Sequence, residues 1–227
     1  MFTGFPPETD QYFLDLRFHN NITFFHETRE RYVRDVQQPF YAFITDILPV
    51  LTEIDPQMEQ RPYKSLARIR RDTRFTKDKT PYRDHLWVWF HRAGEPREDS
   101  LGFWFEFGLS SLSWGLGTWG DCKPMMELFR REIAAHPERV SGIIHSCGLP
   151  ERHLMTFGDN WKRMEVPPSV PEHLRSWYTA KHIGIEQTRP DRGAVRSDKL
   201  LKLVSADYRA LSPIYKLLIG FADDARA

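Results

Sequence analysis

The chain has 227 residues, which is long enough to bury a sizeable hydrophobic core without a disulfide or a metal ion as a staple. Lys and Arg number 32 and Asp and Glu number 31, so the formal charge is only +1. This balance excludes a globally basic nucleic-acid coat protein and an acidic disordered tail. A hydrophobic content of 41% with 28% charged residues excludes an intrinsically disordered chain. We expect a single domain over residues 1–227, since no repeat or long linker divides the sequence.

The ends and the cysteines of the chain indicate its compartment. The N-terminus lacks a basic region followed by an apolar run, so it does not have the pattern of a secretory signal. No stretch approaches the roughly 18–20 apolar residues of a membrane-spanning helix. The two cysteines, Cys122 and Cys147, form neither a disulfide scaffold nor a zinc site by themselves. We therefore expect a cytoplasmic protein without a membrane partner, in which Cys147 is a small core residue.

The first quarter of the chain has the pattern of helices. Residues 8–18 place apolar side chains at helical spacing, and Asn20-Asn21 interrupts the pattern. Apolar residues then recur at helical spacing over residues 24–51. Pro39 and Pro49 are expected to kink or end turns of that segment.

The middle of the chain changes to the two-residue period of β-strands. Alternation is clear in residues 86–90, 101–107 and 112–116, with turns predicted at residues 92–100 and 108–111. Connections this short join antiparallel strands, because a parallel pair needs a crossover of roughly a dozen residues or more. Residues 66–70 and 183–188 are candidates for two further strands.

Helices return after the predicted sheet. Pro124 and Pro137 each suit a first helical position, and Gly148 suits a helix end. Ser197 is the expected N-cap of a terminal helical segment that Pro213 breaks. Helices, then adjacent strands, then helices predict an α+β fold. We expect an antiparallel sheet of about four to five strands, flanked by N-terminal and C-terminal helices.

The nearly neutral total hides a separation of charge along the chain. Residues 61–92 hold ten basic and three acidic residues, a formal charge of +7. The rest of the chain holds 22 basic and 28 acidic residues, a charge of −6. The basic segment is therefore the first place to look for a ligand of opposite charge.

A run of cations within this segment is the candidate site. Guanidinium groups bind phosphate or carboxylate through two parallel hydrogen bonds, and lysines add compact positive charge. The aspartates either hold these cations in place or act as acid–base groups if they are desolvated. In the alternative interpretation the aspartates pair with their neighbours in a structural salt-bridged loop. The candidate ligand-binding residues are Arg68, Arg71, Asp72, Arg74, Lys77, Asp78, Lys79, Tyr82 and, from a later strand, Glu106.

The same run resembles the signature of a known protein family. The pattern is Arg68-x-x-Arg71-Asp72-x-Arg74-Phe75-x-x-Asp78-Lys79-x-x-Tyr82, supported by Phe2-x-Gly4-Phe5, Asn20-Asn21 and Phe24-Phe25 near the N-terminus. It is similar to the domain of unknown function 2461 family, which comprises conserved hypothetical bacterial proteins of about this length with relatives in fungi. The resemblance covers nearly the whole chain and is most specific at the arginine-rich run. It implies no established activity, so catalytic residues stay unassigned.

Glu106 is a candidate because of its apolar neighbours. It lies among Phe103, Trp104, Phe105 and Phe107 and shares a strand face with Trp104. If that face is buried, the carboxylate needs a cation, and the arginine-rich run is the obvious supplier. A sheet with one solvated face gives the same alternation, and in that case Glu106 is exposed.

Two apparent motifs do not have the context that their chemistry requires. Residues 115–120 match G-x-G-x-x-G, but the strands before them are expected to be antiparallel rather than part of a βαβ unit. Glycines that end a strand where side chains do not fit explain the match better. His85 and His91 share a strand face but lie roughly 20 Å apart, too far for one metal ion. We therefore predict no metal site and no cofactor.

Three functions are compatible with the sequence. The first is a site for a small anionic ligand, in an enzyme or a binding protein. The second is a nucleic-acid-binding module that uses Phe75, Tyr82 and tryptophans as stacking platforms, which the charge of −6 elsewhere disfavours. The third is a structural or interaction protein in which the run is a buried ion-pair clamp. The oligomeric state is not predicted.

Overall fold

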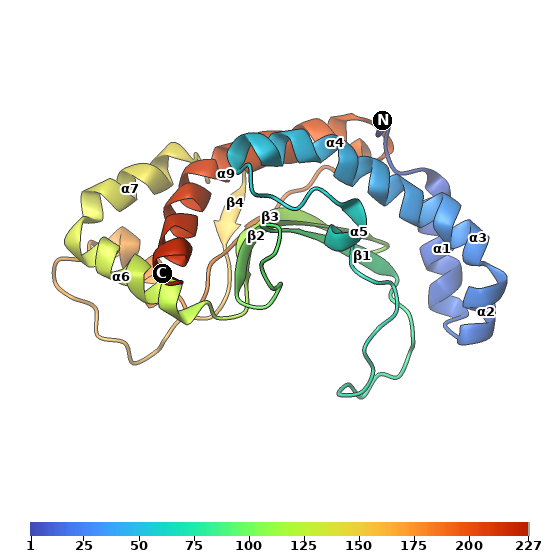
Figure 1. The fold of residues 1–227 in the computed structure, drawn as a ribbon, viewed down its shortest axis with the longest axis horizontal. Helices are drawn as coiled ribbons and strands as arrows, with labels where there is room; N and C mark the ends of the chain where they lie inside the picture. The colour runs from blue at the N-terminus through green and yellow to red at the C-terminus, as the bar shows by residue number, and fades with distance from the viewer. Residues whose placement is uncertain (227) are drawn as a thin grey trace.

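The computed structural model describes residues 1–226 and has the predicted α+β architecture (Figure 1). Residues 8–18 form a helix as expected, and Asn21 caps the next one, since its side chain accepts the N–H of Phe24. Pro39 lies in the first turn of a long helix that continues through Pro49. The helices of this part are α1 (Pro7–Phe18), α2 (Ile22–Glu27), α3 (Arg29–Tyr32), the π-helical η1 (Val33–Gln37), α4 (Gln38–Ile54) and α5 (Pro62–Ser65).

The sheet has five strands, and every neighbouring pair in it is antiparallel. Its order is β1-β2-β3-β5-β4. The three central runs of alternation and the late strand are confirmed. Residues 66–70 are not a regular strand, because only Leu66 and Arg70 make isolated bridges, to Val88 and Tyr82. The strands are β1 (His85–Phe90), β2 (Ser100–Gly108), β3 (Leu112–Trp119), β4 (Leu154–Thr156) and β5 (Gly184–Gln187).

The C-terminal part is helical, and its last helix differs from the prediction. The N-cap of the final helix is Asp198 rather than the expected Ser197, and Ser197 Oγ accepts the N–H of Lys199 at 3.3 Å. Pro213 does not break this helix. Leu211 and Ile214 are buried on either side of the proline, so the core holds both halves in line. The elements are α6 (Lys123–Ala135), α7 (Pro137–Ser146), η2 (Glu172–Leu174), α8 (Arg175–Thr179), η3 (Arg192–Arg196) and α9 (Lys199–Asp224).

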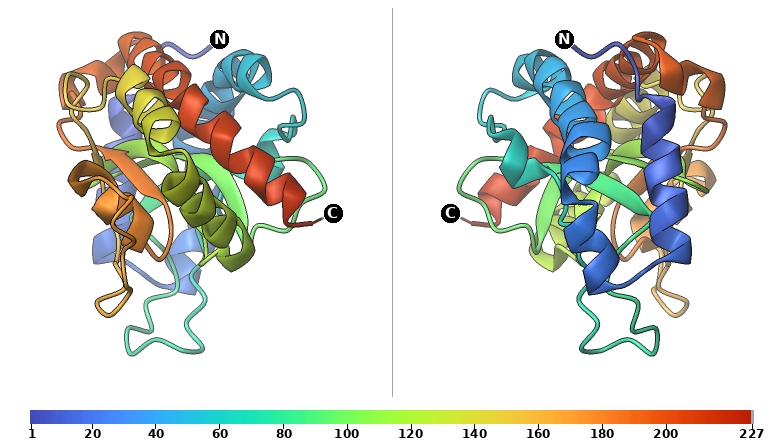
Figure 2. Two further views of the ribbon diagram at one scale, coloured as in Figure 1. Left: turned by 90° about the vertical axis from the view of Figure 1, so that its left-hand side faces the viewer. Right: turned by 90° about the vertical axis from the view of Figure 1, so that its right-hand side faces the viewer.

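Helices α4 and α9 cover one face of the sheet (Figure 1). Phe103 and Phe105 of β2 point toward these helices, where Phe103 lies 4.7 Å from Tyr208 and Phe105 lies 4.3 Å from Phe43, measured between ring centroids. Seen from the two ends, α6 and α7 lie at one end of the molecule and α1 to α3 at the other (Figure 2). The hydrophobic core therefore lies between the helices and one face of the sheet.

The glycines of the apparent dinucleotide motif have a packing role. Gly115 and Gly117 lie within β3 rather than at its end. A Cβ atom on Gly115 would come within 1.8 Å of the carbonyl oxygen of Ile185. Glycine is therefore needed for the close approach of β3 and β5.

Two sequence expectations concern the core and the membrane. Cys147 is buried as predicted, and burial raises the pKa of its thiol. Among residues 1–226, no helix combines the length and the apolar character needed to cross a membrane.

Candidate functional site

The predicted site lies on a loop that we call the arginine loop, residues 66–84. The two arms of the loop run antiparallel, since the N–H of Arg71 donates to the oxygen of Pro81 at 2.8 Å and that of Arg83 to Ile69 at 3.0 Å. Beyond these bonds, residues 71–81 project away from the sheet on the side opposite α4 and α9 (Figure 1). The loop is therefore anchored at its base and open to solvent at its tip.

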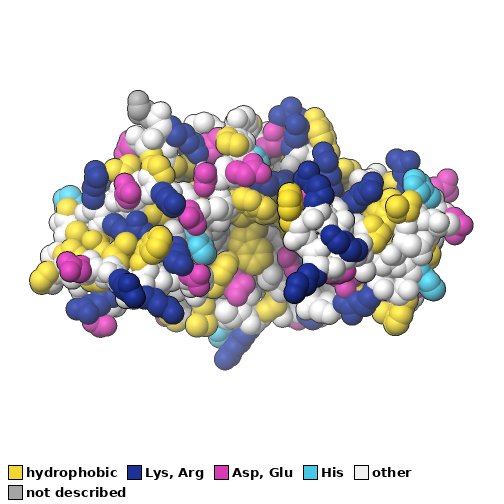
Figure 3. Space-filling view, turned by 90° about the horizontal axis from the view of Figure 1, so that it is seen from below, with side chains coloured by type: hydrophobic (Ala, Val, Ile, Leu, Met, Phe, Trp, Pro, Cys, Tyr) yellow, Lys and Arg dark blue, Asp and Glu magenta, His cyan; other side chains and the backbone are white. Residues whose placement is uncertain are grey.

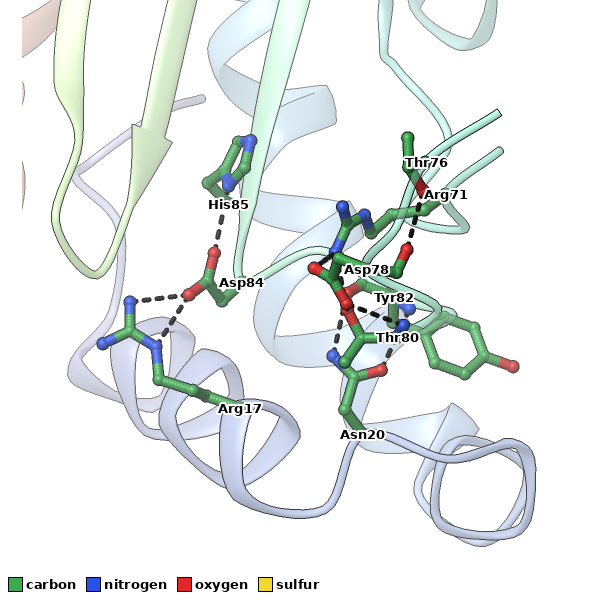
Figure 4. Close-up of polar contacts among 9 residues, drawn as sticks. All are labelled: Arg17, Asn20, Arg71, Thr76, Asp78, Thr80, Tyr82, Asp84 and His85. Atoms are coloured by element: carbon green, nitrogen blue, oxygen red, sulfur yellow. Dashed lines mark hydrogen bonds and ion pairs between the residues drawn. The ribbon is translucent and has the colours of Figure 1, made fainter. Parts of the chain in front are cut away.

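The base of the arginine loop is held by the connection between α1 and α2. The side chain of Asn20 donates to the backbone oxygen of Tyr82 at 2.8 Å and accepts its N–H at 3.0 Å (Figure 4). The Tyr82 ring is buried and stacks on Phe25 with 4.3 Å between ring centroids. Tyr82, predicted to bind a ligand, thus anchors the loop through its backbone and its ring.

The tip of the loop is organised by short-range ion pairs. Arg74 Nη2 lies 2.7 Å from Asp72 Oδ2, and Arg71 pairs with Asp78. Hydrogen bonds from the Arg74 guanidinium lower the pKa of Asp72 to about 2. Hydrogen bonds from the backbone N–H of Thr80 and from Arg71 lower the pKa of Asp78 to about 2. Both aspartates are solvated anions, so they are not the desolvated acid–base groups considered above.

In the first arm of the loop, residues 66–70, the side chains of the last three residues alternate between exposed and buried positions. Ile69 is buried, whereas Arg68 and Arg70 on either side of it are exposed. If the strand continued to Arg71, the side chain of Arg71 would point to the face opposite that of Arg68. The strand pattern ends at Arg70, and Arg71 lines the same cleft as Arg68.

A cleft of about 790 Å³ lies between the arginine loop and β1. Its wall includes Trp87 of β1 and Tyr63 of α5. A cleft of this size suits a small ligand. Its charged lining consists of seven cations, Lys64, Arg68, Arg70, Arg71, Arg74, Arg83 and Arg97, and two anions, Asp72 and Glu98.

Five of these cations have no ion pair with a carboxylate among residues 1–226, namely Lys64, Arg68, Arg70, Arg83 and Arg97. Arg83 donates to the backbone oxygens of Arg68 at 2.9 Å and Arg70 at 2.8 Å. Its guanidinium lies 4.5 Å from the centre of the Trp87 ring. Burial and the nearby charge of Arg71 lower the pKa of Arg83. The cleft thus gathers more positive charge than its two carboxylates, Asp72 and Glu98, balance.

The structure separates the predicted residues into two groups. Arg68, Arg71, Asp72 and Arg74 line the cleft, whereas Lys77 and Lys79 do not. Lys77 is exposed, and Lys79 Nζ donates to the oxygen of Thr73 at 2.8 Å. The cleft residues Lys64, Arg70, Arg83 and Arg97 were not singled out from the sequence.

Asp78 and Tyr82 line a second hollow of about 510 Å³ on the other side of the loop. It also contains Asp84, which lies 2.6 Å from Arg17 Nη2 and 3.0 Å from His85 Nδ1 (Figure 4). Burial opposes ionisation of Asp84, but the hydrogen bonds from His85 and Arg17 outweigh it and lower the pKa. The acidic residues Asp78 and Asp84 of this hollow are therefore both paired with basic side chains.

Glu106 lies on β2, apart from the arginine loop. It is half-buried, and within residues 1–226 it makes no ion pair with the arginines expected to neutralise it. The pairing expected for a buried Glu106 is not formed, because Glu106 faces Trp87 across the strand pair and the cations line the cleft with Trp87. Its titratable neighbour is Glu186 of β5.

These features define an α+β protein with an open antiparallel sheet and a cationic cleft at the β1 edge. The family described as conserved hypothetical protein (DUF2461) matches residues 8–217, from α1 to within α9. The chain belongs to this family, which confirms the resemblance predicted from the sequence. No curated protein and no solved structure matches the chain.

Proposed function

We propose that the cleft binds a small anionic ligand, a phosphate or a carboxylate. The observation that carries this proposal is the set of five cations that line the cleft without a carboxylate partner in residues 1–226. Cations gathered in this way repel one another, so an anion that enters the cleft relieves an electrostatic cost. Arg68 and Arg70 extend from the same arm and are free to make bidentate hydrogen bonds to such an anion.

The structural-clamp hypothesis has less support. It requires a buried ion pair, but the side chains of Asp78 and Arg74 are 54% and 76% exposed. Exposed pairs add little to stability, because water and salt screen them. The pairs Arg71–Asp78 and Arg74–Asp72 shape the tip of the loop and leave the other cations of the cleft available.

Titration calorimetry with inorganic phosphate, pyrophosphate and citrate tests the proposal. We expect at least one of these anions to bind the wild-type protein. Arg68→Ala and Arg70→Ala should each weaken binding about tenfold or more, since a hydrogen bond to a charged group contributes roughly 1.5–3 kcal/mol.

Arg131→Ala is the matched control, because Arg131 is an exposed arginine of α6 outside the cleft. It should bind the same anion as tightly as the wild type. Absence of binding by all three anions contradicts the proposal. An equal loss in the Arg131 variant also contradicts it, because the attraction then comes from overall charge.

A further inference from the structure

The sheet face opposite α4 and α9 carries a group of aromatic and acidic side chains next to the cleft. Trp87 pairs with Glu106, and Trp89 pairs with Trp104, so the four share one face of β1 and β2. Gly115 of β3 pairs with both Trp104 and Glu186, which extends the same face to β5. Figure 3 shows this side of the molecule hollowed at its centre, with hydrophobic side chains on the floor and Lys and Arg along one side.

The two carboxylates of this face are uncompensated. Glu106 and Glu186 are half-buried, and neither forms a side-chain hydrogen bond or an ion pair within residues 1–226. Burial, and then the charge of Glu106, raise the pKa of Glu186. A partly buried carboxylate without a partner is unfavourable unless a bound group compensates it. The face therefore carries an excess of negative charge, whereas the cleft carries an excess of positive charge.

Trp87 joins the two regions. It lines the cleft and lies directly opposite Glu106. Paired side chains on adjacent strands are about 5 Å apart, so Trp87 lies between the cations of the cleft and Glu106, one strand spacing from the carboxylate. The indole Nε1 of Trp87 is buried and has no hydrogen-bond partner in the described part of the chain. An unsatisfied buried donor at this junction is consistent with a ligand that supplies the acceptor.

The surroundings of Glu186 suit a cation. Gly115 separates Glu186 from Trp104 in the same row and leaves the floor between them without a side chain. The Trp104 ring lies 6.4 Å from that of Phe157, edge to face. Aromatic rings attract ammonium groups electrostatically, and carboxylates beside them add to the attraction.

We propose that the cleft and the open sheet face form one site for a small zwitterion, a phosphate monoester that also carries an ammonium group. This inference rests on the proposed anion binding in the cleft. The arginines take the phosphate, and Glu106, Glu186 and the aromatic rings take the ammonium. The opposite charges on either side of Trp87 match the two ends of such a ligand.

Two ligands that differ only in charge test the inference. Phosphocholine and 3,3-dimethylbutyl phosphate have the same shape, but a neutral carbon replaces the nitrogen in the second. We expect calorimetry to show that the wild type binds phosphocholine about tenfold more tightly or better. Glu106→Gln and Glu186→Gln should each reduce this preference without weakening the binding of inorganic phosphate, because they remove negative charge that repels phosphate.

The outcomes separate the inference from the proposed function. Equal binding of the two esters by the wild type overturns the zwitterion site and leaves anion binding intact, and this comparison needs no variant to fold. If neither ester binds and inorganic phosphate, pyrophosphate and citrate do not bind either, the proposed function fails as well.

Two further probes identify the source of the ligand. O-phosphoethanolamine tests a primary ammonium, and sedimentation with phosphatidylcholine vesicles tests a lipid headgroup. Binding to soluble phosphocholine or O-phosphoethanolamine but not to vesicles identifies a free metabolite, and binding to vesicles identifies a lipid.

Discussion

Arg92, the last cation of the basic segment 61–92, is buried between two carboxylates. Its Nε lies 2.6 Å from Asp55 Oδ2, and its Nη1 lies 2.6 Å from Asp223 Oδ1. The Tyr215 hydroxyl also donates to Asp55 Oδ2 at 2.6 Å. This network joins the end of α4, the end of β1 and α9, so the charge of Arg92 is structural. It differs from the five cleft cations that have no carboxylate partner among residues 1–226.

Asp55→Asn should lower the free energy of unfolding by about 3 kcal/mol at neutral pH, because it removes one anion from a buried pair. Burial raises the pKa of Asp55, but the hydrogen bonds from Tyr215 and Arg92 outweigh it, so the pKa lies below the usual 3.8. A lowered pKa stabilises the folded state above that value, and this stability is lost as the pH falls through the folded-state pKa. The difference in free energy of unfolding between the wild type and the variant should therefore shrink between about pH 6 and about pH 3.

Urea unfolding of both proteins at the two pH values measures this deficit. Asp224→Asn is the control, because Asp224 is exposed on the same α9 helix. It should change the free energy of unfolding by less than about 0.5 kcal/mol. A deficit for Asp55→Asn that is the same at both pH values contradicts the assignment of the titrating group.

At the scale of single elements, Gly115 of β3 is the position where the backbone of the neighbouring strand β5 leaves no room for a side chain. Gly142 provides the opposite case, since it lies in the exposed part of α7 with open space around its Cβ position. We expect Gly115→Ala to destabilise the protein by about 1–3 kcal/mol, because the Cβ clashes with the Ile185 carbonyl. Gly142→Ala should stabilise it by about 0.5–1 kcal/mol through helix propensity. Thermal or urea unfolding measures both, and equal effects of the two substitutions contradict the packing role of Gly115.

The whole molecule separates its charge, with +7 in residues 61–92 and −6 elsewhere. A single small anion in the cleft loses affinity only moderately with salt, because few contacts are screened. We expect the affinity for pyrophosphate to fall less than about tenfold between about 50 and 200 mM NaCl. A nucleic acid that makes 6–10 phosphate contacts would lose roughly 10³–10⁵ over the same range.

An electrophoretic mobility-shift assay with single-stranded RNA separates these two functions. We expect no retardation at about 100 mM salt, since the acidic remainder of the chain repels a long polyanion. Retardation with a steep salt dependence favours the nucleic-acid-binding alternative over the small-anion site.

The sequence predicts the long, strongly periodic elements of the fold. Alternation located β1 to β3, and the short turns between them required antiparallel pairing. β4 was not predicted because three residues are too few to show a period. Pro213 was expected to break the terminal helix, but the apolar residues around it are buried against the core and outweigh the local preference.

The sequence locates the candidate site but not its members. The density of cations identified Arg68, Arg71 and Arg74, which the structure brings to the cleft. Arg97 reaches the cleft from the β1–β2 connection, which no local pattern reveals. Glu186 becomes a neighbour of Glu106 only through β3, since β5 is distant in sequence. Such contacts arise from the sheet order, which a single sequence does not specify.

The first arm of the arginine loop lies along β1, which is an edge strand of the sheet. Ala67 donates its N–H to the oxygen of Trp87 at 2.9 Å, so this arm occupies backbone groups that another chain would otherwise pair with. Residues 66–70 therefore protect the sheet from edge-to-edge aggregation, whereas residues 71–81 do not have this role. A change in the backbone conformation of the arm would uncover the edge of β1, whereas a change at residues 71–81 would leave that edge covered.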